Sequence, residues 1–100
     1  MKKITIVFEV PDMTAKDYDA VMNELHAQGK LPNPNLVTHL AFQKGNNWCV
    51  VDVWKSEAAF MDFGKNALGP IFQKLNVQVG QPTVYPVHNF INAEAAMMHA

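Results

Sequence analysis

The chain has 100 residues, of which 49% are apolar and 17% are charged, and its formal net charge is −1. This length predicts a single domain with one hydrophobic core. All eight cations are lysine, so neither a basic patch nor the arginine forks that read phosphates and guanine are present, and we predict no nucleic-acid partner. The charged share lies below the usual quarter for a soluble domain, which predicts that some apolar surface meets a partner.

The cysteine content and the N-terminal sequence indicate a cellular compartment. Cys49 is the only cysteine, which excludes an internal disulfide and fits a reducing environment. Two lysines precede the apolar run ITIVF, but Glu9 interrupts this run and no small-residue cleavage site follows, so we interpret it as a strand rather than a leader. No stretch approaches the ~18–20 apolar residues that span a bilayer. We therefore predict a cytoplasmic protein that does not bind a membrane.

The first third of the chain predicts a strand followed by a helix. Residues 4–10 are largely β-branched and apolar, which is typical of a strand. Thr14 and Asp17 have the spacing of a capping box at a helix start, and Gly29 fits a left-handed cap at its end. Apolar side chains at helical spacing predict the helix itself over residues 15–28; they are Tyr18, Val21, Met22 and Leu25.

The middle of the chain predicts a β-hairpin. Residues 36–43 form its first strand, and residues 48–54, with the sequence WCVVDVW, form its second. The connecting sequence KGNN contains glycine and asparagine, which tolerate the positive φ angles of tight turns. If this turn holds two or four residues, His39 and Asp52 share a face of the sheet, whereas a three-residue turn places them on opposite faces.

The remainder predicts a helical segment and a last strand. Ser56 is placed as an N-cap, and Gly69-Pro70 is expected to end the helix, with Pro70 opening a second, short helix. Residues 83–90 predict the last strand, in which Pro86 requires an edge position or a bulge. Residues 92–100 form an Ala- and Met-rich tail that could be helical.

The order strand–helix–strand–strand–helix–strand predicts an α+β fold of the ferredoxin-like βαββαβ type, with two helices on one face of a four-stranded antiparallel sheet. We assign this domain to residues 4–91. The other face of such a sheet is normally polar where it meets water. Here the strand at residues 48–54 is apolar on both faces except for Asp52. We therefore predict that a second copy covers the open face and that the protein is a homodimer; a monomer with a tolerated apolar sheet is the alternative.

Three segments resemble the dimeric α/β-barrel superfamily, and within it the antibiotic-biosynthesis-monooxygenase-like domains. They are VVDVWKSEAAFMDF at residues 50–63, LGPIFQKL at residues 68–75 and VYPVHNFI at residues 84–91. The resemblance implies two sheets packed face to face in a homodimer, with a pocket between sheet and helices in each subunit. Relatives include cofactor-independent oxygenases of polyketide quinols, haem-degrading enzymes, isomerases and proteins without a known reaction. Because residues 56–75 lack the histidine that ligates haem in this superfamily, we predict no haem and no other cofactor.

Asp52 and His39 are the candidate catalytic residues. A carboxylate within an apolar strand needs partners or changes its pKa, so Asp52 could act as a general base or orient a histidine. A His39–Asp52 pair could perform acid–base chemistry on a phenol or an enol. The alternatives are a structural acid bonded to backbone or lysine, and a core histidine bonded to a carbonyl. A metal site formed by Asp52, His39 and His88 lacks supporting spacing, and we predict none.

Aromatic residues are the candidate ligand contacts. Trp48, Trp54, Phe42, Phe60, Phe63 and Phe72 could form a pocket wall for a flat apolar ligand or simply be core. As ligand contacts we select Trp54 and Phe63, which mark where the sheet meets the second helix. On the first helix we select Tyr18 and Met22. His88, in the last strand, could line the pocket or a dimer contact, and its edge position favours the contact.

Two functions therefore remain open. One is a small dimer that binds an apolar or aromatic molecule and performs cofactor-free oxygenation or proton transfer. The other is a non-catalytic ligand-binding or stress-related dimer. A pocket of ~300 Å³ or more that is bordered by Asp52 or a histidine favours the first function, and a closed interior favours the second.

Overall fold

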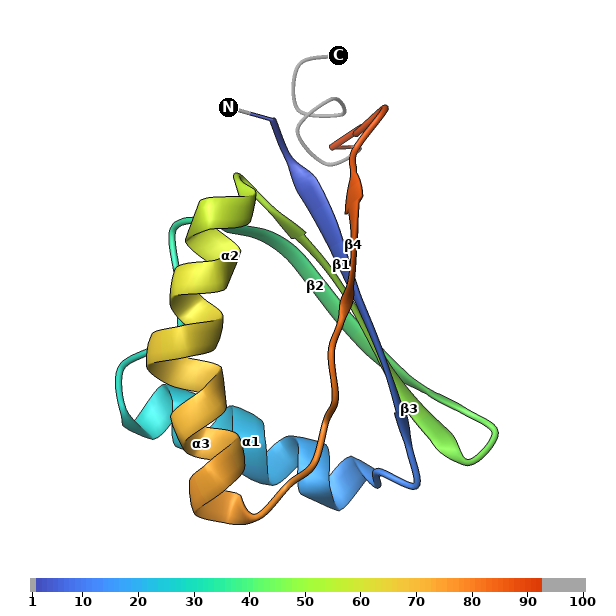
Figure 1. The fold of residues 1–100 in the computed structure, drawn as a ribbon, viewed down its shortest axis with the longest axis vertical. Helices are drawn as coiled ribbons and strands as arrows, with labels where there is room; N and C mark the ends of the chain where they lie inside the picture. Colours follow the sequence, from blue (N-terminus) through green and yellow to red (C-terminus); the bar gives the residue numbers. More distant parts are fainter. Residues whose placement is uncertain (1, 93–100) are drawn as a thin grey trace.

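The computed structural model describes residues 2–92. Its elements follow the predicted order (Figure 1) and are β1 (Ile4–Pro11), α1 (Ala15–Ala27), β2 (Leu36–Lys44), β3 (Asn47–Trp54), α2 (Glu57–Phe63), the π-helical turn η1 (Gly64–Leu68), α3 (Gly69–Leu75) and β4 (Thr83–Pro86). The predicted tail at residues 92–100 lies outside the described residues, apart from Asn92. No helix within residues 2–92 combines the length and apolar character needed to cross a membrane.

The four strands form one antiparallel sheet in the order β2-β3-β1-β4. This is the predicted ferredoxin-like topology, and β4 lies at an edge, as Pro86 required. The prediction that this strand continues to residue 90 is wrong. Pro86 has no N–H to donate, the Val87 N–H makes a single bond to the Lys3 carbonyl at 3.1 Å, and the chain then bends at His88.

Local sequence signals fix the helix starts. Thr14 and Asp17 form the predicted capping box, in which each side chain accepts a hydrogen bond from the other's backbone N–H. The Ser56 hydroxyl accepts from the Ala59 N–H at the start of α2. Gly29, just beyond α1, has a φ of 70°, as the predicted left-handed cap required.

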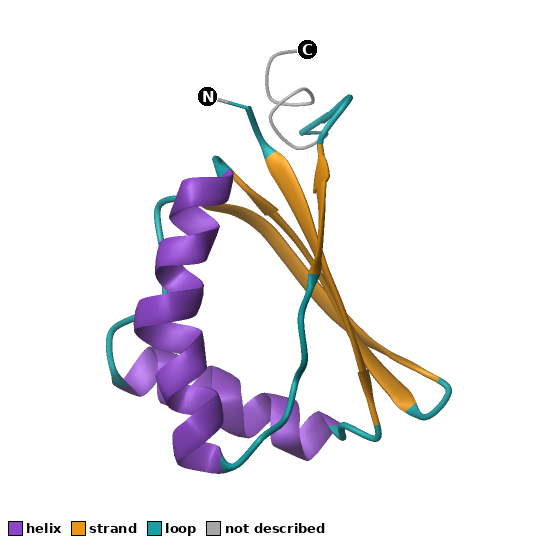
Figure 2. Cartoon of the chain, in the orientation of Figure 1, coloured by secondary structure: helices purple, strands orange, loops and turns teal. Residues whose placement is uncertain are grey.

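The second helical segment does not break at Gly69-Pro70, contrary to prediction. Elements α2, η1 and α3 form one continuous rod (Figure 2). At its centre the Gly69 N–H donates to the Gly64 carbonyl five residues earlier. A wider π-turn of this kind relieves the clash that a proline ring makes with the preceding turn of an α-helix, so Pro70 is accommodated without a break.

All helices lie on one face of the sheet (Figure 2). Alternate side chains of β1 point toward them and form the centre of the core together with Trp54, Phe60 and Ile71; those of β1 are Ile4, Ile6, Phe8 and Val10. Within residues 2–92 the opposite face carries no helix, and large apolar side chains are exposed on it. Leu40 is 51% exposed, Phe42 43% and Tyr85 54%.

Candidate functional site

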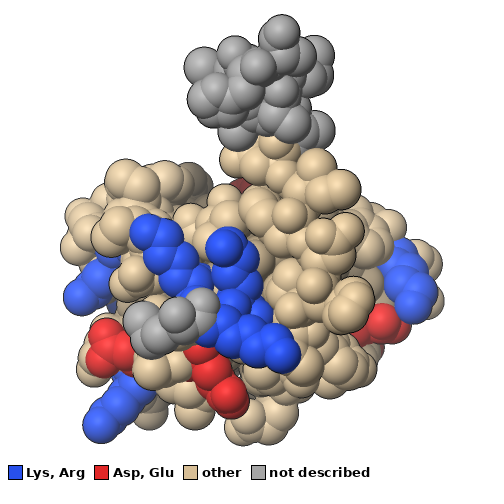
Figure 3. All heavy atoms as spheres, turned by 90° about the horizontal axis from the view of Figure 1, so that it is seen from above, with Lys and Arg blue, Asp and Glu red and all other residues tan. Residues whose placement is uncertain are grey.

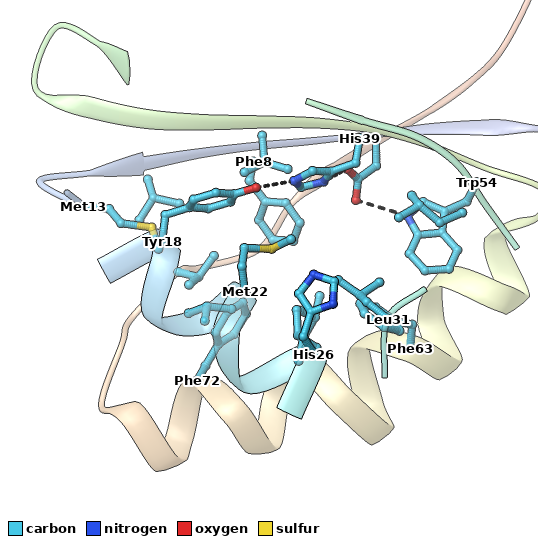
Figure 4. Close-up of a pocket in the computed structure, with 18 of the residues that line it drawn as sticks. Phe8, Met13, Tyr18, Met22, His26, Leu31, His39, Trp54, Phe63 and Phe72 are labelled. Atoms are coloured by element: carbon cyan, nitrogen blue, oxygen red, sulfur yellow. Dashed lines mark hydrogen bonds and ion pairs between the residues drawn. The ribbon is translucent and has the colours of Figure 1, made fainter. Parts of the chain in front are cut away.

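A pocket of about 300 Å³ lies between the sheet and the helices. Its walls come from the inward faces of β1, β2 and β3, from one side of α1, from the following loop and from the α2–α3 rod (Figure 4). The lining residues are Phe8, Val10, Met13, Tyr18, Val21, Met22, Leu25, His26, Leu31, Pro32, Leu36, His39, Val50, Asp52, Trp54, Phe63, Leu68, Phe72 and Val79. The pocket is therefore largely apolar, with a few polar groups at defined places, as is typical of small-molecule sites.

The register of the hairpin places His39 beside Asp52. Lys44 pairs with Asn47, so the turn between them holds two residues, and His39 lies directly opposite Asp52. A two-residue turn is one of the two lengths predicted to place His39 and Asp52 on the same face of the sheet. Gly45 in the turn has a φ of 58°, which glycine adopts without steric cost. A β-bulge between Leu36 and Thr38 re-aims the start of β2, so that Leu36 and His39 both line the pocket.

Four side chains form a continuous hydrogen-bond chain along the pocket wall. The Tyr18 hydroxyl oxygen lies 2.5 Å from Nε2 of His39, and Nδ1 of His39 lies 2.6 Å from Oδ1 of Asp52. The second carboxylate oxygen of Asp52 accepts from the Trp54 indole N–H at 3.2 Å. Figure 4 shows Tyr18 and His39 pointing toward each other, with Trp54 at the far end. We call this set the Tyr18–Trp54 chain.

The direction of the hydrogen bonds follows from the chemistry of the groups. An ionised carboxylate can only accept hydrogen bonds, so Nδ1 of His39 carries the ring proton and donates it to Asp52. In the neutral form of the ring, Nε2 is then an acceptor to which the Tyr18 hydroxyl can donate. Asp52 thereby selects the histidine tautomer whose lone pair faces Tyr18 and the pocket, which is the arrangement that prepares a histidine to accept a proton.

Burial and nearby charge act together on Tyr18. Desolvation of the phenol, then the negative charge of Asp52 and of Asp19, raise the pKa of Tyr18 above its ordinary value of 10.0. Removing the phenol proton would create a second negative charge near a buried carboxylate, which is unfavourable. Tyr18 therefore stays protonated at physiological pH and acts as a hydrogen-bond donor in the resting site.

Aromatic packing fixes the Trp54 end of the hydrogen-bonded Tyr18–Trp54 chain. Asp52 is 7% exposed and Trp54 1% exposed. The Trp54 ring contacts Phe60 and Phe63, with ring centroids 5.8 Å and 5.0 Å apart. Because aromatic side chains fix the indole on one side and Asp52 accepts its N–H on the other, the carboxylate has little freedom to turn away from His39.

The structure brings most of the predicted site residues together. Among the candidates, Asp52, His39, Trp54, Phe63, Tyr18 and Met22 all line the pocket. His88 does not line the pocket. It is exposed in the bend after β4, so the prediction that it is a strand residue is wrong. Of the proposed aromatic wall, Phe72 also lines the pocket, Phe60 lies in the core, and Trp48 packs against Tyr18 with centroids 5.2 Å apart.

Phe42 lies outside the pocket, whereas His26, which the sequence did not single out, lines it. Phe42 pairs with Cys49 on the outer face of the sheet because it lies three positions from His39 and therefore has the opposite strand parity. His26 lines the pocket but was not predicted. Its spacing of four residues from Met22 and eight from Tyr18 places His26 on their side of α1, but that this side borders the pocket follows only from the docking of α1 on the sheet.

Comparisons with known proteins show what the fold resembles. The chain matches no family model and no curated protein sequence. Among solved structures it resembles SnoaB, a cofactor-independent oxygenase from Streptomyces nogalater, with a TM-score of 0.64 at 14% identity over 92% of this chain and 99% of that one. A candidate antibiotic biosynthesis monooxygenase from Caulobacter crescentus gives a TM-score of 0.63 at 14% identity over 90% of this chain and 92% of that one.

A second candidate antibiotic biosynthesis monooxygenase, from Bordetella bronchiseptica, gives a TM-score of 0.58 at 13% identity over 91% of this chain and 100% of that one. The resemblance predicted from the sequence is therefore confirmed at the level of the fold: the chain has the ferredoxin-like fold of SnoaB and of the proteins from Caulobacter crescentus and Bordetella bronchiseptica.

The electrostatic coupling between Tyr18 and Asp52 gives a first prediction. The chain has two tyrosines, so in a Tyr85→Phe background ultraviolet absorbance reports the ionisation of Tyr18 alone. We expect its pKa to lie above 10.0 and to fall when Asp52→Asn removes the neighbouring negative charge. Asp62→Asn, the same change at an exposed position on α2, should leave the Tyr18 pKa unaltered. Equal titration curves for the two Asp→Asn variants would contradict the coupling.

Proposed function

We propose that this protein is a small homodimer that binds an uncharged aromatic molecule in the pocket and removes a proton from it, and that the resulting anion reacts with dioxygen without a cofactor. The observation that carries this proposal is the Tyr18–Trp54 chain on the wall of an otherwise apolar pocket of about 300 Å³. A carboxylate–histidine–hydroxyl chain has the directional order of a proton relay.

The charge of the pocket supports an uncharged ligand. No lysine is among the lining residues, and Asp52 is the only carboxylate among them. A bound carboxylate or phosphate would find no cation and would be repelled by Asp52, whereas a neutral aromatic molecule gains from contact with Met22, Phe63 and Phe72. A phenol, enol or acidified methylene group is neutral on entry and acidic enough to lose a proton.

The hydrogen-bond chain supports a route for that proton. The Tyr18 hydroxyl lies within hydrogen-bond distance of Nε2 of His39. With Nε2 unprotonated, a substrate proton can pass to the Tyr18 oxygen as Tyr18 transfers its own proton to His39. Tyr18 remains neutral throughout, consistent with its raised pKa. The imidazolium formed at His39 then carries one positive charge between two negative ones, the Asp52 carboxylate at Nδ1 and, beyond the Tyr18 hydroxyl, the new substrate anion.

Oxygenation of such an anion balances without a further reductant. For an anthrone-type substrate, deprotonation of the methylene gives a carbanion that donates electrons to dioxygen and forms a carbon–oxygen bond. Protonation gives a hydroperoxide, which loses water to leave a carbonyl group. The methylene is oxidised, one oxygen atom remains on the substrate and the other leaves as water. The protein has to position the substrate and hold and return one proton.

Non-catalytic binding is the second candidate function. Every polar group of the Tyr18–Trp54 chain already has a partner within the chain. A buried polar network that is fully satisfied can serve to rigidify a core and specify its shape. In that case the pocket holds a ligand, but His39 does not exchange a proton with it.

The open face of the sheet supports the homodimer. Leu40 and Val51 pair across β2 and β3, and Val51 pairs with Val7 on β1, so apolar side chains run across the middle of this face. Figure 3 shows one end of the molecule rather than this face, and the charged side chains visible there are lysines gathered together and a few acidic residues. A contiguous apolar patch on a domain with so little charge is typical of an interface, and an identical sheet offers the matching surface.

The relay gives a direct test by oxygen uptake with anthrone- or quinol-type substrates. We expect His39→Gln and Asp52→Asn to lower the initial rate by roughly 10²–10⁴-fold, the usual contribution of general acid–base catalysis. His88→Gln is the matched control at an exposed histidine outside the pocket and should retain the wild-type rate. Circular dichroism checks that all three variants fold.

Two outcomes would contradict parts of this proposal. Equal oxygen uptake by the wild type, His39→Gln and Asp52→Asn would remove both residues from the mechanism. Saturable binding of the aromatic molecule by a wild-type protein that consumes no oxygen would reject oxygenation and leave the binding function.

The dimer gives a test by sedimentation velocity at micromolar concentration. We expect the wild type to have a sedimentation-derived mass of twice the 11.2 kDa of one chain. We expect Leu40→Glu to be a monomer, because the dimer would bury the new charge in an apolar interface. Met61→Glu is the matched control, since Met61 is 58% exposed on α2 and Leu40 is 51% exposed. A well-folded monomeric wild type would contradict the proposed assembly.

A further inference from the structure

His26 lies on the α1 side of the pocket, across from the strand residues of the Tyr18–Trp54 chain (Figure 4). It belongs to the last turn of α1 and follows Tyr18 and Met22 along the same side of this helix. In Figure 4 its ring points from α1 into the pocket, between Met22 and Leu31, toward the wall that carries His39 and Trp54. The side chain is exposed, so it lies at the rim where a ligand would enter.

The hydrogen-bonding capacity of the pocket distinguishes His26 from the other polar residues. Tyr18, His39, Asp52 and Trp54 are bonded to one another. In the described part of the chain, by contrast, no hydrogen bond or ion pair involves the His26 ring. The ring nitrogens offer one donor and one acceptor in the neutral form. His26 is thus the lining side chain with polar capacity that the protein itself does not use.

From this placement we infer that His26 is a specificity-determining residue that hydrogen-bonds a second oxygen atom of the ligand, at the end remote from the Tyr18–Trp54 chain. The preferred ligand is then an extended aromatic molecule with oxygen functions at both ends. One oxygen or acidic group meets Tyr18, and the other meets His26. This inference rests on the proposed ligand site and assigns the substrate class of that site.

The second oxygen also has a chemical consequence. When the end near Tyr18 loses its proton, conjugation through the aromatic system carries part of the negative charge to the distant oxygen. A hydrogen bond donated by His26 stabilises that charge more than it stabilises the neutral ligand, because hydrogen bonds to charged acceptors are stronger than bonds to neutral ones. His26 therefore favours ligands in which the two ends are conjugated.

A binding cycle with two probes tests the inference. The probes are 2-naphthol, which has one hydroxyl, and 2,6-dihydroxynaphthalene, which has a second hydroxyl at the opposite end; calorimetry is performed without oxygen. We expect the wild type to bind the diol roughly two- to tenfold more tightly than 2-naphthol, the value of one net hydrogen bond. His26→Leu should abolish this preference with little change in 2-naphthol affinity, and His26→Gln should restore part of it.

His88→Leu is the matched control and should keep the wild-type preference for the diol. An unchanged diol preference in His26→Leu would overturn the inference while leaving the pocket as the binding site. Failure of the wild type to bind either naphthol would instead overturn the ligand site itself. Calorimetry thus separates the failure of the inference from the failure of the proposed function.

Discussion

The hydrogen bond between His39 and Asp52 is the interaction on which the site depends. The two residues lie opposite each other on the neighbouring strands β2 and β3, and Nδ1 of His39 is 2.6 Å from Oδ1 of Asp52. A slip of one residue in the hairpin register would turn one of them to the outer face and leave a buried carboxylate without its partner. The same bond selects the histidine tautomer, so a single contact links the alignment of the sheet to the proton chemistry of the pocket.

The surroundings of this bond decide what it can do. The indole of Trp54 occupies the second carboxylate oxygen, and burial together with the negative charges of Asp52 and Asp19 keeps Tyr18 protonated. The remaining walls are almost entirely apolar. A polar chain of this kind can exchange a proton with a neutral aromatic ligand, whereas the negative charge of Asp52 would repel a ligand that enters as an anion. On the opposite face of the sheet, the exposed Leu40 and Phe42 are suited to association.

Local patterns in the sequence predicted the strand order, the capping box and the pocket role of Tyr18, Met22, Trp54 and Phe63, because each rests on period, caps or turn residues. The pairing of His39 with Asp52 could be stated only conditionally, since it depends on the turn length. Three features required three-dimensional information. The π-turn before Pro70 depends on a carbonyl five residues away, the end of β4 depends on pairing with β1, and His26 appears polar and solvent-facing until α1 is docked on the sheet.

The most direct test of the account is the tautomer of His39, measured by nitrogen-15 nuclear magnetic resonance on histidine-labelled protein. The account predicts a neutral ring protonated at Nδ1 with Nε2 unprotonated, and the loss of this preference in Asp52→Asn. A ring protonated at Nε2 in the wild type would contradict it, because His39 would then have no lone pair with which to accept a proton from Tyr18.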